Sequence, residues 1–135
     1  MNSPLLGVDI GFKRTGVALS ESGIIAHPLQ VIEADPPHMS KVLHQLVALV
    51  GQYSIKTLVI GMPYHEDESL SPQAEKVTAL VHNLQILLKA THPEVKLVTS
   101  NEFYTSKEAK QLYPTTDKDS AAAAIILQDY ITSYA

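Results

Sequence analysis

The chain contains no cysteine among its 135 residues. This absence excludes disulfide-stapled scaffolds, zinc sites with thiolate ligands and cysteine nucleophiles, and it fits a reducing compartment. The longest apolar stretch, Ala121 to Leu127, is far shorter than the ~20 residues that a bilayer-spanning helix needs. The N-terminal residues lack the basic segment of a secretory signal. We therefore expect a cytoplasmic protein without membrane partners.

Positive charge is also scarce. Ten Lys and Arg residues stand against fourteen Asp and Glu residues, which gives a net charge of -4 and argues against binding of nucleic acid through bulk electrostatics. The only arginine, Arg14, stands beside Lys13. Any contact with nucleic acid must therefore be local or metal-assisted. This pair either contacts backbone phosphates or merely keeps an exposed turn soluble.

The pattern of apolar residues predicts the fold class. We expect strands at Leu5 to Ile10, Thr15 to Ser20, Ile24 to Ile32, Lys56 to Met62 and Val95 to Ser100. We expect helices at Pro37 to Tyr53, from Ser71-Pro72 onward, from Thr105 to Pro114, and from about Asp117 to the C-terminus. The length is that of one domain. The prediction is an α/β domain over residues 1–135: a mixed five-stranded sheet, three antiparallel strands then two parallel, flanked by about four helices.

The first expected strand carries an aspartate, Asp9, inside its apolar run. An unpaired carboxylate in a core strand costs several kcal/mol or more, so a cation, hydrogen bonds or water must meet it. Gly11 and Gly16 flank a basic pair just beyond, which predicts a tight hairpin. Asp9 is thus either a metal ligand or a residue that ends the strand by bonding to its own turn.

Three acidic residues fall where such a sheet brings distant segments together: Asp9, Glu102 after the fifth strand, and Asp119 at the head of the last helix. Ligands of α/β sheets gather at the carboxyl ends of parallel strands. Carboxylates that meet there repel one another, and a hard divalent cation, Mg²⁺ or Mn²⁺, relieves the repulsion. The alternatives are that Asp117 or Asp119 only caps the helix and that Glu102 is a solvated loop residue.

Four segments, in order along nearly the whole chain, resemble the YqgF (RuvX) family of the RNase H-like superfamily. The first is Gly7 to Gly11 with Lys13 to Ala18, and the others are Leu58 to Pro63, Asn101 to Ser106, and Lys118 to Ala122. The resemblance implies an RNase H-like fold and catalytic, metal-binding carboxylates at Asp9, Glu102 and Asp119. It also implies phosphodiester hydrolysis with two bound metal ions.

The family is described as Holliday junction resolvases and as pre-16S rRNA nucleases. The resemblance therefore implies a nuclease that processes the 5′ end of pre-16S rRNA or resolves branched DNA, with ribosomal precursor particles and a second copy of the chain as candidate partners. Two residues depart from the family pattern: Asn101 stands in place of an aspartate and Phe103 in place of an arginine. These departures motivate the alternative of a nucleic-acid-binding or scaffold protein that has kept the fold and lost the chemistry.

Two further features of the sequence bear on function. His65, in the loop after the fourth strand, either lines the site or is solvated, and the other histidines show no metal-ligand spacing. A phosphotransferase of the actin and sugar-kinase group also has a phosphate hairpin that reads Asp-x-Gly. That function requires a second domain and a second phosphate loop, which this length does not supply.

Overall fold

The computed structural model describes residues 3–11, 13–34, 39–62, 72–101, 113–114 and 117–134. The chain forms, in order, β1 (Leu5–Ile10), β2 (Arg14–Ser20), β3 (His27–Glu33), α1 (Met39–Gln52), β4 (Thr57–Met62), α2 (Pro72–Thr91), β5 (Lys96–Asn101) and α4 (Lys118–Tyr134). Within the described ranges, no helix is both long and apolar enough to cross a membrane. The predicted third helix lies outside the described residues.

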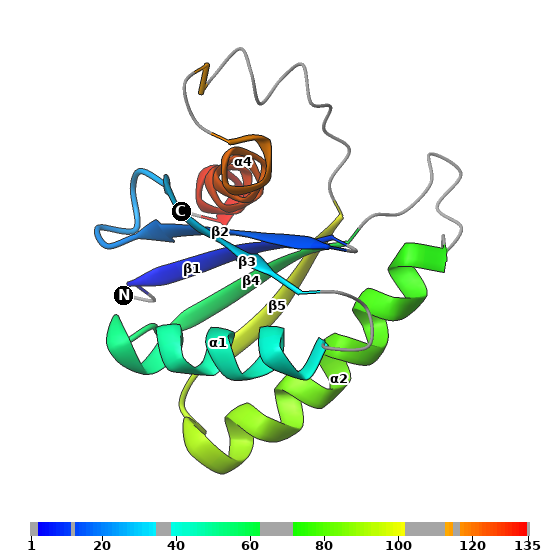
Figure 1. The fold of residues 1–135 in the computed structure, drawn as a ribbon. Coiled ribbons are helices and arrows are strands. Elements are labelled where there is room, and N and C mark those ends of the chain that lie inside the picture. The colour runs from blue at the N-terminus through cyan, green and yellow to red at the C-terminus, as the bar shows by residue number, and fades with distance from the viewer. Residues whose placement is uncertain are drawn as a thin grey trace.

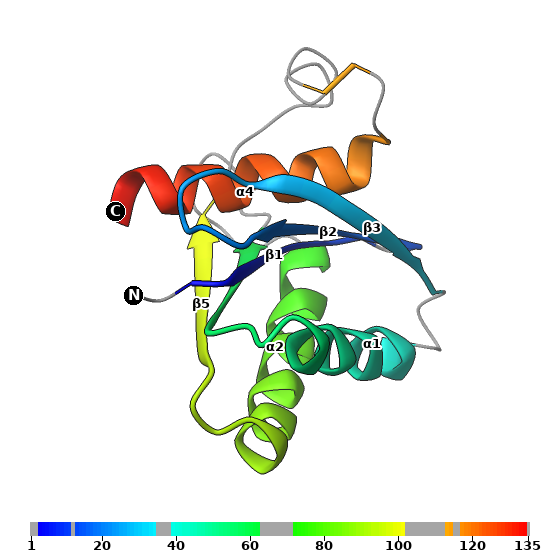
Figure 2. The same ribbon diagram turned by 90° about the vertical axis from the view of Figure 1, so that its left-hand side faces the viewer.

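The five strands form one sheet in the order β3-β2-β1-β4-β5. The pairs β1–β2 and β2–β3 are antiparallel, and β1–β4 and β4–β5 are parallel. This arrangement confirms the predicted mixed sheet with β1 at its centre. Helix α4 covers one face, and α1 and α2 cover the other (Figures 1 and 2). The α/β fold therefore has three layers around a single sheet.

The alternation of side chains along β1 decides which face of the sheet Asp9 occupies. Leu6, Val8 and Ile10 belong to the core beneath α1 and α2. The residues between them point the other way, because a Cβ added at Gly7 would meet Leu127 of α4 at 2.6 Å. Successive residues of a strand point to opposite faces. Asp9 therefore lies on the face that α4 covers.

Helix α4 approaches the sheet closely because both surfaces are made of small residues. Its run from Ala121 to Ala124 is buried. On the sheet side, a Cβ at Gly16 would lie only 1.8 Å from the carbonyl oxygen of Asp119. No side chain fits between them, so glycine at this position brings the first turn of α4 against β2.

The third strand begins later than the expected Ile24. Ile24 and Ile25 are 67% and 55% exposed and precede the strand, which starts at His27. The Gln128 side chain accepts a hydrogen bond from the Ala26 amide and donates one to the Ile24 carbonyl. These contacts with α4 satisfy backbone groups that a longer strand would have paired. Strand β3 lies at the edge of the sheet, and its pairing register with β2 shifts next to Pro28, as suits a residue without a backbone N–H.

We predict that Gly16→Ala destabilises the protein by about 1–3 kcal/mol, the usual effect of overpacking a tight contact. The new methyl group would collide with the Asp119 backbone and displace the start of α4. The matched control is Gly51→Ala in α1, where the new Cβ would meet only the tip of the His92 side chain at 3.3 Å. Urea unfolding of both variants measures the difference. Equal stabilities would contradict the close approach of α4.

Candidate functional site

Asp9 lies among small residues at the carboxyl end of the parallel strands. Its partner across the antiparallel pair is Gly16. On the other side of β1, Val8 pairs with Ile60 of β4. The same parallel register places the next residue, Asp9, beside Gly61, and Gly61 pairs with Ser100 of β5. Helix α4 occupies the space over both glycines, because an added Cβ would lie 1.8 Å from the Asp119 carbonyl oxygen at Gly16 and 2.5 Å from Ile126 Cδ1 at Gly61. The small residues of this row therefore let α4 lie directly beside the strand position of Asp9.

Asp119 reaches the same edge from the first turn of α4. Its carbonyl lies against Gly16, the residue that pairs with Asp9. The Asp119 side chain is 18% exposed, and its Oδ2 is buried without a hydrogen-bond partner in the described part of the chain. Buried carboxylate oxygens are costly to leave unpartnered. The fold therefore brings two of the three predicted acids to one edge, with an unsatisfied oxygen on one of them.

Asp117, rather than Asp119, caps the helix. Asp117 Oδ1 accepts a 2.7 Å hydrogen bond from the Ser120 backbone amide, and Oδ2 accepts a second from the Ser120 hydroxyl. Partial burial alone would raise the pKa of the Asp117 carboxyl, but these hydrogen bonds outweigh it and hold the pKa below its ordinary value. Asp119 is therefore not needed as the cap.

We predict that Asp117→Ala lowers the free energy of unfolding by about 0.5–2 kcal/mol at neutral pH, the usual effect of removing a helix cap. The carboxylate has a lower pKa in the folded chain than in the unfolded one. Its contribution is thus complete above pH ~4 and is lost as the pH falls through the folded-state value. Urea unfolding at neutral pH and near pH 3 checks this. A difference that grew on acidification would contradict it.

Glu102 and His65 lie outside the described residues. The structure describes the backbone of β5 as far as Asn101, the residue before Glu102, at the same edge of the sheet. Within the described ranges, no group of three Asp, Glu or His side chains is placed to hold a metal ion. The structure thus brings the strand position of Asp9 and the start of α4 at Asp119 to one edge of the sheet, and metal binding by Asp9, Asp119 and Glu102 stays a prediction.

The predicted basic pair forms part of a larger cationic cluster. Lys13, Arg14, Glu33 and Lys41 line a shallow pocket of about 390 Å³. Lys41, from the first turn of α1, donates a 2.8 Å hydrogen bond to the Glu33 carbonyl. Sequence reasoning missed Lys41 because a lysine on a helix usually serves only solvation, and nothing in the chain order links it to the hairpin. We call Lys13, Arg14 and Lys41 the basic cluster.

Arg14 lies between two carboxylates. Its Nε is 3.8 Å from Glu33 Oε1, and its NH1 is 3.9 Å from Asp119 Oδ2. Both distances exceed those of a direct hydrogen bond, and the Arg14 side chain is more than half exposed. Such loose pairs are weak in water. Arg14 is therefore positioned to partly neutralise Asp119 and remains able to turn toward an incoming anion.

The residues at this edge suit a hard divalent cation. Asp9 and Asp119 offer carboxylate oxygens, the ligands that Mg²⁺ and Mn²⁺ prefer. The buried Asp119 Oδ2, which has no hydrogen-bond partner among the described residues, is consistent with a cation ligand at this edge. The residue before Glu102 is Asn101, whose side chain is an amide. Its oxygen could serve as an uncharged metal ligand but would not add a negative charge.

Comparison with known proteins agrees with this geometry. The sequence model of a family described as "RuvX: Holliday junction resolvase" matches residues 3–133. The chain belongs to the RuvX family. Among RuvX relatives, a "Putative pre-16S rRNA nuclease" of Desulforudis audaxviator is 32% identical, with 96% of this chain and 94% of the relative covered. A protein of the same description from Crocosphaera subtropica is 35% identical, with 93% and 90% covered.

Solved structures of proteins with low sequence identity to this chain share its fold. RuvC from Thermus thermophilus, solved in complex with a Holliday junction substrate, superposes with a TM-score of 0.62 at 13% identity, covering 97% of this chain and 95% of that one. The yeast mitochondrial Holliday junction resolvase superposes with a TM-score of 0.53 at 12% identity, covering 96% and 79%. At such identities the likeness establishes a shared RuvC-like, RNase H-like fold. The predicted fold and family of this RuvX chain are thus confirmed.

Proposed function

We propose that this RuvX protein is a divalent-metal-dependent endonuclease that hydrolyses phosphodiester bonds of structured nucleic acid. The observation that carries the proposal is the contact of Gly16 with the Asp119 backbone, because Gly16 is also the partner of Asp9. Two carboxylates more than a hundred residues apart in the sequence are thereby held at one edge. Membership of a family described as resolvases supports the same chemistry.

The proposed metal ligands are Asp9, Asp119 and Glu102, with Mg²⁺ or Mn²⁺ as the cofactor. Asp9 would help to hold both ions, and Asp119 and Glu102 would each help to hold one. Bound ions supply a water of lowered pKa and neutralise charge on the leaving oxygen. The chain contributes fixed carboxylates: Asp9 is held within a central strand, and Asp119 within the first turn of a capped helix. This rigidity favours a preformed site.

The basic cluster is proposed to bind backbone phosphates next to the cleaved bond. Arg14 presents a planar fork of donors, which suits phosphate oxygens. In the structure the Arg14 guanidinium lies 3.9 Å from the Asp119 carboxylate. Cation binding at Asp119 would satisfy that carboxylate and leave Arg14 to contact the substrate. With a net charge of -4, the chain depends on such local contacts to hold nucleic acid.

The favoured substrate is the precursor of 16S rRNA, because relatives that match nearly the full chain carry that description. Branched DNA is the second candidate, since the family description names Holliday junction resolvases. Ribosomal precursor particles and a second copy of the chain stay candidate partners. The alternative of a binding or scaffold protein without turnover is motivated by Asn101 and Phe103.

We predict that Asp9→Asn and Asp119→Asn each reduce Mn²⁺-dependent cleavage by more than about 100-fold, beyond the usual effect of losing an outer partner of a metal site. Both substitutions keep the shape of the side chain and remove a charged ligand. Asp129→Asn is the matched control, because Asp129 is an exposed aspartate farther along α4 and its substitution makes the same chemical change. Cleavage of precursor rRNA and of branched DNA, with and without Mn²⁺, is measured together with Mn²⁺ binding by calorimetry.

Cleavage by Asp9→Asn at the wild-type rate would overturn the assignment of the site. Metal-independent binding of nucleic acid without cleavage by the wild type would select the scaffold alternative. Faster cleavage of branched DNA than of precursor rRNA would overturn the substrate preference alone.

We predict that Arg14→Gln and Lys41→Gln weaken binding to nucleic acid and reduce the slope of log affinity against log salt by about one each. Each substitution removes one contact with a phosphate, so fewer counterions are released when the nucleic acid binds. Lys89→Gln, in the last turn of α2 and remote from the basic cluster, is the control. Fluorescence anisotropy in EDTA at several salt concentrations measures the slopes. An unchanged slope for Lys41→Gln would remove that residue from the interface.

A further inference from the structure

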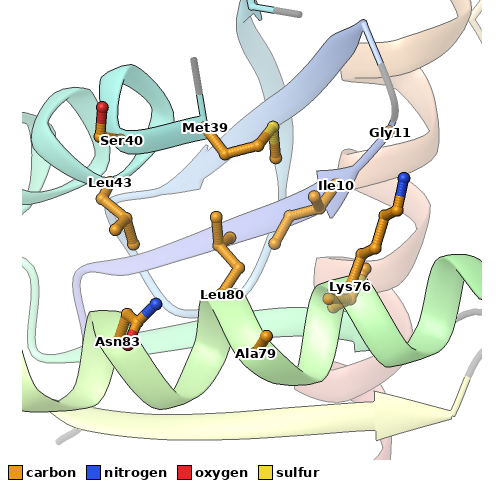
Figure 3. A pocket seen from close by; sticks show the side chains of 10 residues that line it. Ile10, Gly11, Met39, Ser40, Leu43, Lys76, Ala79, Leu80 and Asn83 are labelled. Carbon is orange, nitrogen blue, oxygen red and sulfur yellow. The ribbon is translucent and has the colours of Figure 1, made fainter. Parts of the chain in front are cut away.

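A pocket of about 430 Å³ opens at the end of β1, on the face of the sheet that α1 and α2 cover. Figure 3 shows its apolar walls: Ile10 of β1, Met39 and Leu43 of α1, and Leu80 of α2 point into the same space. The volume lies within the range of small-molecule sites, about 300–1,000 Å³. Concave apolar surface of this extent is a sign of a binding function.

The pocket and the acidic site share one edge of the sheet but occupy opposite faces. Ile10 and Gly11, which line the pocket, follow Asp9 directly in the chain. Asp9 itself faces α4. The first turn of α1 connects the pocket to the basic cluster, because Ser40 lines the pocket and the next residue is Lys41. A nucleic-acid strand held at this edge would therefore pass the mouth of the pocket.

The polar residues of the pocket define the ligand that it suits. Among the described residues that line it, none is acidic and Lys76 is the one cation. Its ammonium group points toward Gly11, and Asn83 supplies an amide on the other side, whereas the Ser40 hydroxyl points away from the cavity (Figure 3). The Met39 thioether adds a polarisable surface that favours aromatic rings. A flat apolar ring system with hydrogen-bonding edges and an attached anion matches this combination.

We propose that this pocket binds one unpaired nucleobase of the substrate, with an adjoining phosphate at Lys76. The inference rests on the proposed function insofar as the nucleotide belongs to the nucleic acid bound for cleavage. A base can enter the pocket only after it leaves the stack of its own strand, as in proteins that extrude bases. An apolar peptide side chain is the competing occupant, and it carries neither an anion nor the hydrogen-bonding edges of a base.

The first test fills the pocket from its rim. Ala79 of α2 is exposed and lines the pocket, so Ala79→Phe adds bulk without removing a core contact. The control is Ala90→Phe, an exposed alanine of the same helix that is not part of the lining. Both are made in the Asp9→Asn protein, and anisotropy is measured in EDTA with a short labelled single-stranded RNA and its blunt duplex. Thermal unfolding confirms that both variants fold.

We expect Ala79→Phe to weaken single-strand binding at least about fivefold, the loss typical of one stacked base. Duplex binding should be unchanged, and Ala90→Phe should behave as the parent. Equal effects of Ala79→Phe and Ala90→Phe on the single strand would overturn the proposal. Equal weakening of single strand and duplex by Ala79→Phe would also overturn it, because the pocket would then not select unpaired bases.

A second test locates the ligand directly. Methyl resonances of Leu43, Val77 and Leu80 are followed by NMR during titration with adenosine monophosphate, inorganic phosphate or a short leucine-rich peptide. Shifts with the nucleotide, and none with phosphate alone, support the proposal. Shifts with the peptide only would assign the pocket to a protein partner and overturn it.

These measurements separate this inference from the proposed nuclease activity, because they require no cleavage and no metal. If the protein binds bases in the pocket but never cleaves, the base-binding proposal stands and the proposed nuclease activity is overturned. If cleavage depends on Asp9 but Ala79→Phe leaves single-strand binding unchanged, the proposed nuclease activity stands and the base-binding proposal is overturned.

Discussion

The close contact between α4 and the sheet is the constraint on which the candidate site depends. With 1.8 Å between a hypothetical Gly16 Cβ and the Asp119 carbonyl, only glycine lets the first turn of α4 lie on β2. The same glycine is the partner of Asp9. One residue without a side chain therefore sets the spacing of two carboxylates from opposite ends of the chain. Buried small residues along α4 extend this contact down the helix and keep its start in place.

The contact also creates an electrostatic problem that the local residues solve only in part. Bringing Asp9 and Asp119 together concentrates negative charge, and Asp117 stands just before the same helix. Asp117 is satisfied by its two hydrogen bonds with Ser120, whereas the charged partner of the Asp119 side chain within the described ranges is Arg14, at 3.9 Å. A helix N-terminus favours an anion by about 0.3–1 kcal/mol, which is small beside the cost of an unpartnered buried carboxylate oxygen. The remaining imbalance is what a divalent cation would remove.

Much of this arrangement could be predicted from the sequence, because local patterns determine it. The apolar segment from Lys56 to Met62 predicts the strand that forms β4. The position of Asp9 inside an apolar run indicates that its carboxylate has a special role. The sequence could not decide which of Asp117 and Asp119 caps α4, because both are good caps and only the Ser120 contacts separate them. It also missed Lys41, since the link between α1 and the first hairpin is made in space through the Glu33 carbonyl. The start of β3 was misplaced because Gln128, far along the chain, fixes the backbone at Ile24 and Ala26.

At the end of β1, neighbouring side chains of different chemical character point to opposite faces of the sheet. Alternation sends Asp9 toward α4 and Ile10 toward α1 and α2, so a polar site and an apolar pocket begin at adjacent residues. The basic cluster stands next to both, because β2 leaves the hairpin at Arg14 and α1 begins two residues before Lys41. A strand of nucleic acid at this edge can present its phosphates to the cations and carboxylates and turn a base toward the apolar side. The period-two geometry of a single strand would thus separate the proposed cleavage site from the proposed base-binding pocket.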